Sequence, residues 1–237
     1  GEYTVYAQTD WDGAPTSIVS DQRTFTVFAQ TEQTLETPVI LAFPDEFINQ
    51  DSATLLWTTA GTDEDYFVAQ IATDPGFQVG VRQQISRGGS ARFDVLEDSQ
   101  QYYFRVKAQN NAGGVSEWSE TATVTVDTLS PSVGEVVAEN GRISPTTDLS
   151  FSWETNPFSE IGSGILWYEI EGSTDPTFVD EAQQIFSNDR FVGTSTSFSG
   201  EQGQTYFVRV RAMDGVGNWS DWAESSGTLI DTTAPEA

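Results

Sequence analysis

The chain has 237 residues and contains neither cysteine nor histidine. Without cysteine it has no disulfide framework, no thiolate metal site and no cysteine nucleophile. Without histidine it lacks the usual general base and the commonest zinc ligand. Ser-His-Asp, Cys-His and zinc-hydrolase chemistries are therefore excluded. Paired carboxylates are the one catalytic arrangement left open, but the acidic residues fall in turns and at outward strand positions, so we expect no enzyme.

Long hydrophobic runs are also absent. No stretch approaches the roughly 20 consecutive apolar residues that a membrane-spanning helix needs, so we expect no membrane insertion in this region. No secretion signal opens the chain, and its first residues read as a strand already under way. We interpret the chain as part of a longer extracellular or cell-surface protein.

Basic residues are scarce, with 10 Lys and Arg against 36 Asp and Glu and a net charge of −26. Such a surface repels nucleic acid and anionic lipid, so we expect neither as a partner. The expected surface is acidic and solvated, and salt screens its self-repulsion. Such a surface favours a cation-rich medium, and specific calcium binding is an alternative because calcium prefers oxygen ligands.

The sequence contains an internal repeat, which indicates a tandem array. The segment YYFRVKA in the first copy matches YFVRVRA in the second. The offset between matched positions grows from 96 to 101 and then 104 residues along the chain. The two copies therefore differ in loop length and not in their strands. The matched positions are Trp57 and Trp153, Phe77 and Phe178, Tyr102 and Tyr206, and Trp118 and Trp222.

The repeat predicts the division of the chain into domains. Two whole domains are expected at residues 34–129 and 130–232, with residues 233–237 as a linker or the start of a following domain. Residues 1–33 resemble the C-terminal hairpin of a truncated domain, with Tyr3 and Val5 on its inner face. An isolated hairpin is marginal in water. We therefore expect strands outside this sequence, or another subunit, to complete it.

Apolar and polar residues alternate with a period of two, which is typical of half-buried strands. Leu149, Phe151 and Trp153 share one side of a segment, with serines between them. Runs rich in Val, Thr, Phe and Tyr end at turns rich in Gly, Asn and Asp. About seven short strands in ~100 residues predict an all-β fold, with antiparallel immunoglobulin-like sandwiches in tandem.

These positions resemble the fibronectin type III family over residues 36 to 231. The family has a buried tryptophan on its second strand and a tyrosine that opens its sixth strand. Leu96 stands six residues before the tyrosine of the first copy, as in the family's tyrosine corner, whereas Phe198 stands eight residues before that of the second. The resemblance implies fold more than function, and it favours a bacterial or archaeal surface or secreted protein. The implied structural core is Trp57, Trp153, Tyr102 and Tyr206.

Cations and tryptophans cluster at the predicted sixth strands. The set resembles the Trp-Ser-x-Trp-Ser box of cytokine-receptor fibronectin domains, in which indoles lie between guanidinium groups. Val115 replaces the first tryptophan in one copy, and Ala223 replaces the last serine in the other. We interpret the cluster as cation–π cladding, with a ligand or glycan platform as the alternative. Its members are Arg105, Lys107, Trp118, Arg209, Arg211, Trp219 and Trp222.

Four acidic residues are weaker candidates for calcium ligands, namely Asp127, Asp231, Asp10 and Asp12. The first two stand in the predicted joints between domains, and the other two lie in an acidic turn. None fits the spacing of a twelve-residue calcium loop. We therefore expect no bound cofactor and treat calcium as the alternative. Asn218 opens an Asn-Trp-Ser glycosylation sequon in a loop that we expect to be exposed.

The joints are short and contain proline, which restricts the angle between neighbouring domains. The sequence therefore predicts a semi-rigid rod that acts as a spacer or assembly unit of a surface or filament-forming protein, with a structural or adhesive function. Its expected partners are copies or neighbouring domains of the same protein, and glycans as a further alternative. The alternative function is a spacer or carbohydrate-binding accessory region of a secreted polysaccharide-degrading enzyme.

Overall fold

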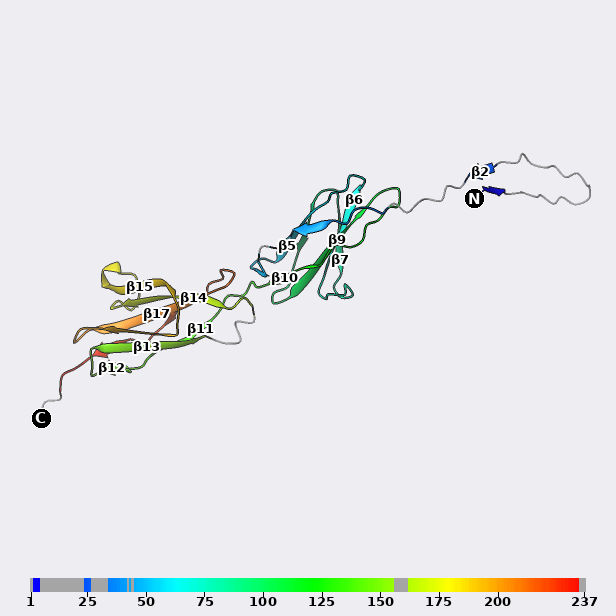
Figure 1. Ribbon diagram of the computed structural model, residues 1–237. Helices are drawn as coiled ribbons and strands as arrows, with labels where there is room; N and C mark the ends of the chain where they lie inside the picture. Colours follow the sequence, from blue (N-terminus) through cyan, green and yellow to red (C-terminus); the bar gives the residue numbers. More distant parts are fainter. Residues whose placement is uncertain are drawn as a thin grey trace, which may run out of the picture.

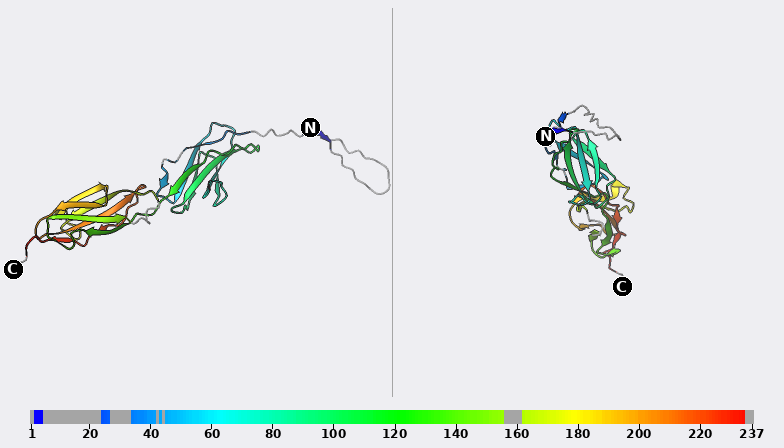
Figure 2. Two further views of the ribbon diagram at one scale, coloured as in Figure 1. Left: turned by 60° about the horizontal axis from the view of Figure 1, so that its bottom comes forward. Right: turned by 90° about the vertical axis from the view of Figure 1, so that its right-hand side faces the viewer.

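A computed structural model describes residues 2–4, 24–26, 34–41, 43, 45–155 and 162–234. Two β-sandwiches follow one another along the chain (Figure 1), and the left view of Figure 2 shows them end to end. We call them sandwich one and sandwich two. The only helix in the described ranges is the 3-10 turn η1 Glu181–Gln183. No helix in those ranges is long and apolar enough to cross a bilayer.

Sandwich one packs a three-stranded sheet in the order β3-β5-β8 against a five-stranded sheet in the order β4-β10-β9-β6-β7. All its strand pairs are antiparallel except the short parallel pair of β4 and β10. This arrangement is that of the fibronectin type III sandwich. The strands are β3 Val39–Leu41, β4 Phe47–Ile48, β5 Ser52–Thr58, β6 Tyr66–Ala72, β7 Arg82–Ser86, β8 Ser90–Asp94, β9 Gln101–Gln109 and β10 Ala122–Val126.

Sandwich two repeats this plan. Its three-stranded sheet has the order β11-β13-β16, and its larger sheet has the order β12-β19-β17-β14-β15, with β18 paired to β17. The short pair of β12 and β19 is again parallel. The strands are β11 Val133–Ala138, β12 Ile143–Ser144, β13 Asp148–Thr155, β14 Ile165–Ser173, β15 Gln184–Phe191, β16 Ser195–Ser199, β17 Thr205–Asp214, β18 Ala223–Glu224 and β19 Thr228–Ile230.

Each sandwich has its own hydrophobic core, built from alternate residues of facing strands. Trp57 and Trp153 are each 3% exposed. Trp153 packs against the rings of Tyr168 and Phe191, with centroid distances of 5.7 and 5.8 Å. The inward residues of β9 and β17 are also buried, as the period-two pattern predicts. The all-β, immunoglobulin-like fold expected from the sequence is confirmed.

Both sandwiches contain the tyrosine corner. The hydroxyl of Tyr102 accepts a hydrogen bond from the backbone N–H of Glu97 at 2.9 Å, and that of Tyr206 accepts one from Glu201 at 2.7 Å. The shifted aromatic residue therefore leaves the second corner intact. Phe198 packs edge-on against Tyr206 at 5.6 Å. The position six residues before Tyr206 is a glycine, where a Cβ atom would overlap the tyrosine ring.

The N-terminal segment contains one strand pair of its own. Strand β1 Glu2–Thr4 pairs antiparallel with β2 Thr24–Thr26 in a separate two-stranded sheet. The side chains of this pair, including Tyr3, and the whole of Val5 lie outside the part of the chain that the structure describes. The domain that this hairpin belongs to, and what completes it, stays a prediction.

Candidate functional site

The aromatic residues and cations of sandwich two form an alternating row on the outer face of β17. The guanidinium carbon of Arg209 lies 4.6 Å from the ring centroid of Phe178 and 4.3 Å from that of Trp222. That of Arg211 lies 4.6 Å from Trp222 and 4.5 Å from Trp219. Each cation thus contacts two rings, and Trp222 contacts both cations.

Carboxylates of the neighbouring strand β14 neutralise this row. Nε of Arg209 donates to Oε2 of Glu171 at 2.6 Å, and Nε of Arg211 donates to Oε2 of Glu169 at 2.6 Å. Both pairs are cross-strand neighbours in the register of β14 and β17. The cations therefore have carboxylate and ring partners already, which favours structural cladding over ligand capture.

Sandwich one contains the same row with different partners. The guanidinium carbon of Arg105 lies 3.9 Å from the ring centroid of Phe77 and 4.1 Å from that of Trp118, and Nζ of Lys107 lies 4.7 Å from Trp118. Gln70 accepts two hydrogen bonds from Arg105, at 2.9 and 2.8 Å. An amide thus stands where sandwich two has a carboxylate.

Buried serines attach the tryptophan-bearing segments to the sixth strands. In sandwich one, Ser116 and Ser119 accept hydrogen bonds from the backbone N–H groups of Ala108 and Val106. In sandwich two, Ser220 and Ser225 accept from Ala212 and Val208, both at 2.9 Å. Ala223 departs from the serine pattern because it pairs directly with Val210 through β18. Ser225 supplies the second hydroxyl two residues later.

In each sandwich an Asp-Pro-x-Phe loop positions a phenylalanine ring against the arginine at the end of the cation row. The sequence analysis did not predict this contact. Phe77 and Phe178 have φ angles of 53° and 54°, in the left-handed region that is strained for a bulky residue. Asp74 accepts backbone hydrogen bonds from Gly76, Gln78 and Val79, and Asp175 accepts them from Thr177, Val179 and Asp180. Recurrence of this loop at an offset of 101 residues was the signal that could have revealed it.

These hydrogen bonds predict a pH dependence. The backbone N–H of Asp180 and the other donors hold the pKa of Asp175 far below its usual value of 3.8. Because the folded pKa is depressed, the stabilisation is fully present above the unfolded pKa and is lost as pH falls through the folded value. Asp175→Asn should therefore lower the urea midpoint of sandwich two more at about pH 7 than at about pH 2. A difference that does not change with pH would contradict this account.

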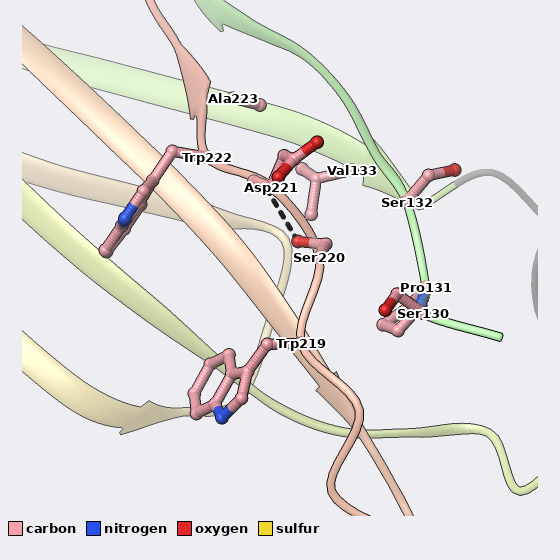
Figure 3. Close-up of a pocket in the computed structure, with 9 residues that line it drawn as sticks. All are labelled: Ser130, Pro131, Ser132, Val133, Trp219, Ser220, Asp221, Trp222 and Ala223. Carbon is pink, nitrogen blue, oxygen red and sulfur yellow. Dashed lines mark hydrogen bonds between the residues drawn. The ribbon is translucent and has the colours of Figure 1, made fainter. Parts of the chain in front are cut away.

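A groove lies between the interdomain linker and the segment that contains Trp219 and Trp222 (Figure 3). Its volume is about 360 Å³. In Figure 3 both indole rings lie on the far side of their segment from Ser130 and Pro131. The residues that line the groove include Trp219 and Trp222 together with small side chains such as Ser220. The ligand or glycan platform that the sequence offered as an alternative for the cation–tryptophan cluster stays a prediction.

The joint between the two sandwiches is closed by hydrogen bonds around Asp127, which is 6% exposed. Its carboxylate Oδ2 accepts from the backbone N–H of Ser163 at 2.6 Å. Its backbone carbonyl accepts from Nδ2 of Asn218 at 2.9 Å, and the same amide reaches the carbonyl of Leu129 at 3.3 Å. Nδ2 of Asn49 donates to the carbonyl of Val216 at 2.9 Å.

Two features make this joint specific. A Cβ atom on residue 162 would overlap the carboxylate of Asp127, so Gly162 permits the close approach. Asn218 also donates to Asp214 at 2.9 Å, and its side chain is half-buried. Asn218 opens the sequon noted in the sequence, and its amide donates within the joint. Ser163, Asn218 and Asn49 were missed as joint residues, since only the folded loops bring them together.

The calcium candidates are not gathered into a site in the described residues, where no group of three potential carboxylate ligands occurs. Asp127 is used in the joint. Asp231 accepts from the backbone and hydroxyl of Thr233 at 3.1 and 2.5 Å and from Gln202 at 3.2 Å. The hydroxyl of Thr233 makes the largest contribution to lowering the pKa of Asp231. Asp10 and Asp12 lie outside the described residues.

Comparisons with known proteins give a distant relative. No family model matches this chain. Exoglucanase B of Cellulomonas fimi is 27% identical over 199 residues, which cover 79% of this chain and 17% of the relative's length. The crystal structure of the chicken CNTN1 FN1–FN3 domains aligns with 17% identity and a TM-score of 0.42, over 82% of this chain and 67% of that one. The assignment of the fibronectin type III fold rests on the strand order described above.

Proposed function

We propose that this chain is a non-catalytic, semi-rigid spacer in an extracellular or cell-surface multidomain protein. The observation that carries this proposal is the buried carboxylate of Asp127, which links the end of sandwich one to the loop before β14 in sandwich two. A buried, hydrogen-bonded carboxylate is costly to separate from its donor. The joint thereby resists bending, whereas a flexible tether would not.

The rest of the molecule supports the same function. The cations on the sheet faces are occupied by rings, carboxylates and an amide. Lack of histidine and cysteine removes the commonest catalytic groups from the whole sequence. The chain therefore acts through its length and stiffness, as a spacer or assembly unit of a surface protein or filament.

Spin labels on the two sandwiches test this proposal, and the lack of native cysteine makes introduced cysteines the only thiols. Ser90 of β8 and Ser195 of β16 occupy equivalent exposed positions. The distance distribution between labels at these sites should be narrow. Asp127→Ala and Gly162→Ala should broaden it about twofold or more, as for a released linker. Asp231→Ala is the matched control and should leave it unchanged. A broad distribution in the unaltered chain would overturn the proposal.

The second candidate function is an accessory region of a secreted polysaccharide-degrading enzyme. The similarity to an exoglucanase over most of this chain favours it. The spacer function predicts that the chain alone shows no saturable binding to cellulose or to an array of soluble glycans. Saturable binding that Trp219→Ala and Trp222→Ala abolish would instead support a carbohydrate-binding function for this region.

A further inference from the structure

The last strand of sandwich two ends in the same way as the last strand of sandwich one. In sandwich one, Asp127 donates its backbone N–H to Ile48, and Val126 exchanges backbone hydrogen bonds with residues 99 and 100. In sandwich two, Asp231 donates to Ser144, and Ile230 exchanges hydrogen bonds with residues 203 and 204. The backbone that leads out of β19 is thus held like the backbone that leads out of β10.

The first linker residue is also held in the same way. Thr128 donates its N–H and hydroxyl to Oδ1 of Asp98, at 2.6 and 2.8 Å. Thr232 donates the same two groups to Oε1 of Gln202, at 2.7 and 2.6 Å. Thr232 stands 104 positions after Thr128, and Gln202 stands 104 positions after Asp98. The direction in which the chain leaves each sandwich is therefore set by equivalent contacts.

The two ends differ in what covers the aspartate. Asp127 is 6% exposed because the loops of sandwich two cover it and Ser163 donates to its carboxylate. Asp231 is exposed and binds only groups of its own sandwich and linker among the described residues. Asp231 has the position of Asp127 without the partner loops.

We propose that the end of β19 is a docking surface for a further immunoglobulin-like sandwich, with Asp231 as the acceptor for a backbone N–H of that sandwich. This inference rests on the proposed spacer function, because it extends the same joint to a second place. The partner sandwich must contain two features that sandwich two itself presents to sandwich one. It needs a glycine followed by a free backbone N–H, as at Gly162 and Ser163, and an amide side chain equivalent to Asn218.

Sandwich one is a poorer partner for this surface. A register shift between Ile165 and Trp167 separates the loop before β14 from the loop before β6, so no strand pairing aligns Gly61 and Thr62 with Gly162 and Ser163. Gly114 accepts from Asn110 in the way that Asn218 accepts from Asp214, so a glycine replaces the amide donor. The surface on sandwich two also lacks one contact, because Pro145 stands where Asn49 follows Ile48. The proposed joint therefore depends on Asp231 and on the linker carbonyls.

An extended chain tests this directly: residues 1–231 followed by a second copy of residues 128–237. The added sandwich then presents Gly162, Ser163 and Asn218 to Asp231. Labels at Ser195 and at its duplicate report on the new joint, and labels at Ser90 and the first Ser195 report on the natural one. The new joint should give a narrow distribution at the distance of the natural joint. Asp231→Ala should broaden the new distribution about twofold or more and leave the other unchanged, as for a released linker.

The reverse change separates this inference from the proposed function. Asp127→Ala in the extended chain should broaden only the natural joint. A broad natural joint in the unaltered chain would contradict the spacer function itself. A narrow natural joint beside a new joint that is broad, or that does not respond to Asp231→Ala, would overturn the docking surface while leaving the spacer function in place.

Discussion

Replacing Trp153 by alanine should strongly destabilise sandwich two and leave the stability of sandwich one unchanged. The indole is 3% exposed and packs against Tyr168 and Phe191. Truncation of a buried tryptophan costs about 3–5 kcal/mol, which is a large share of the roughly 5–15 kcal/mol that holds a domain together. Urea unfolding followed by amide NMR signals from each sandwich separately measures the two losses. Trp57→Ala should destabilise sandwich one by a similar amount and leave sandwich two unchanged.

Two controls make this prediction sharp. Nε1 of Trp153 has no hydrogen-bond partner among the described residues, so Trp153→Phe loses volume without losing a polar contact and should cost less than the alanine variant. Trp222 lies on the outer face over Arg209, and Trp222→Ala should cost about 1 kcal/mol. Equal losses for Trp153→Ala and Trp222→Ala would show that the cores are assigned wrongly.

Replacing Tyr206 by phenylalanine should destabilise sandwich two by about 1–3 kcal/mol, because the N–H of Glu201 loses its acceptor in a crowded corner. Tyr102→Phe should cost a similar amount in sandwich one, where Glu97 is the donor. Tyr103 is the matched control, since its hydroxyl bonds an exposed glutamine at 2.7 Å and Tyr103→Phe should change little. Urea midpoints of the three variants give the comparison. An unchanged midpoint for Tyr206→Phe would show that the corner contributes nothing to stability.

The sequence predicted the fold because the fold depends on local alternation. Phe151, Trp153 and Val208 are all buried, as the period of two requires. The contacts of the cations with rings also follow from sequence, since residues two apart on a strand share a face and a tryptophan-bearing segment follows. The position of Phe178 did not follow, because its contact with Arg209 depends on a left-handed backbone angle in the loop before η1.

The joint was beyond prediction from sequence for a different reason. Asp127 was noted as a linker acid and a weak calcium candidate, whereas its carboxylate accepts from the backbone of Ser163. A backbone donor has no signature in the sequence. Asn218 was interpreted as a glycosylation position, and its part in the joint depends on how the loop between β17 and β18 folds back toward the linker. Long-range contacts between loops of different sandwiches are set by tertiary structure alone.

The measurement that tests the central claim most directly is ¹⁵N relaxation of the backbone amides across both sandwiches. If the joint at Asp127 is semi-rigid, the two sandwiches tumble together, and their amides fit one elongated diffusion tensor with a common long axis. Asp127→Ala should split this into two faster and independent motions. Independent tumbling of the two sandwiches in the unaltered chain, indistinguishable from that of Asp127→Ala, would contradict the account.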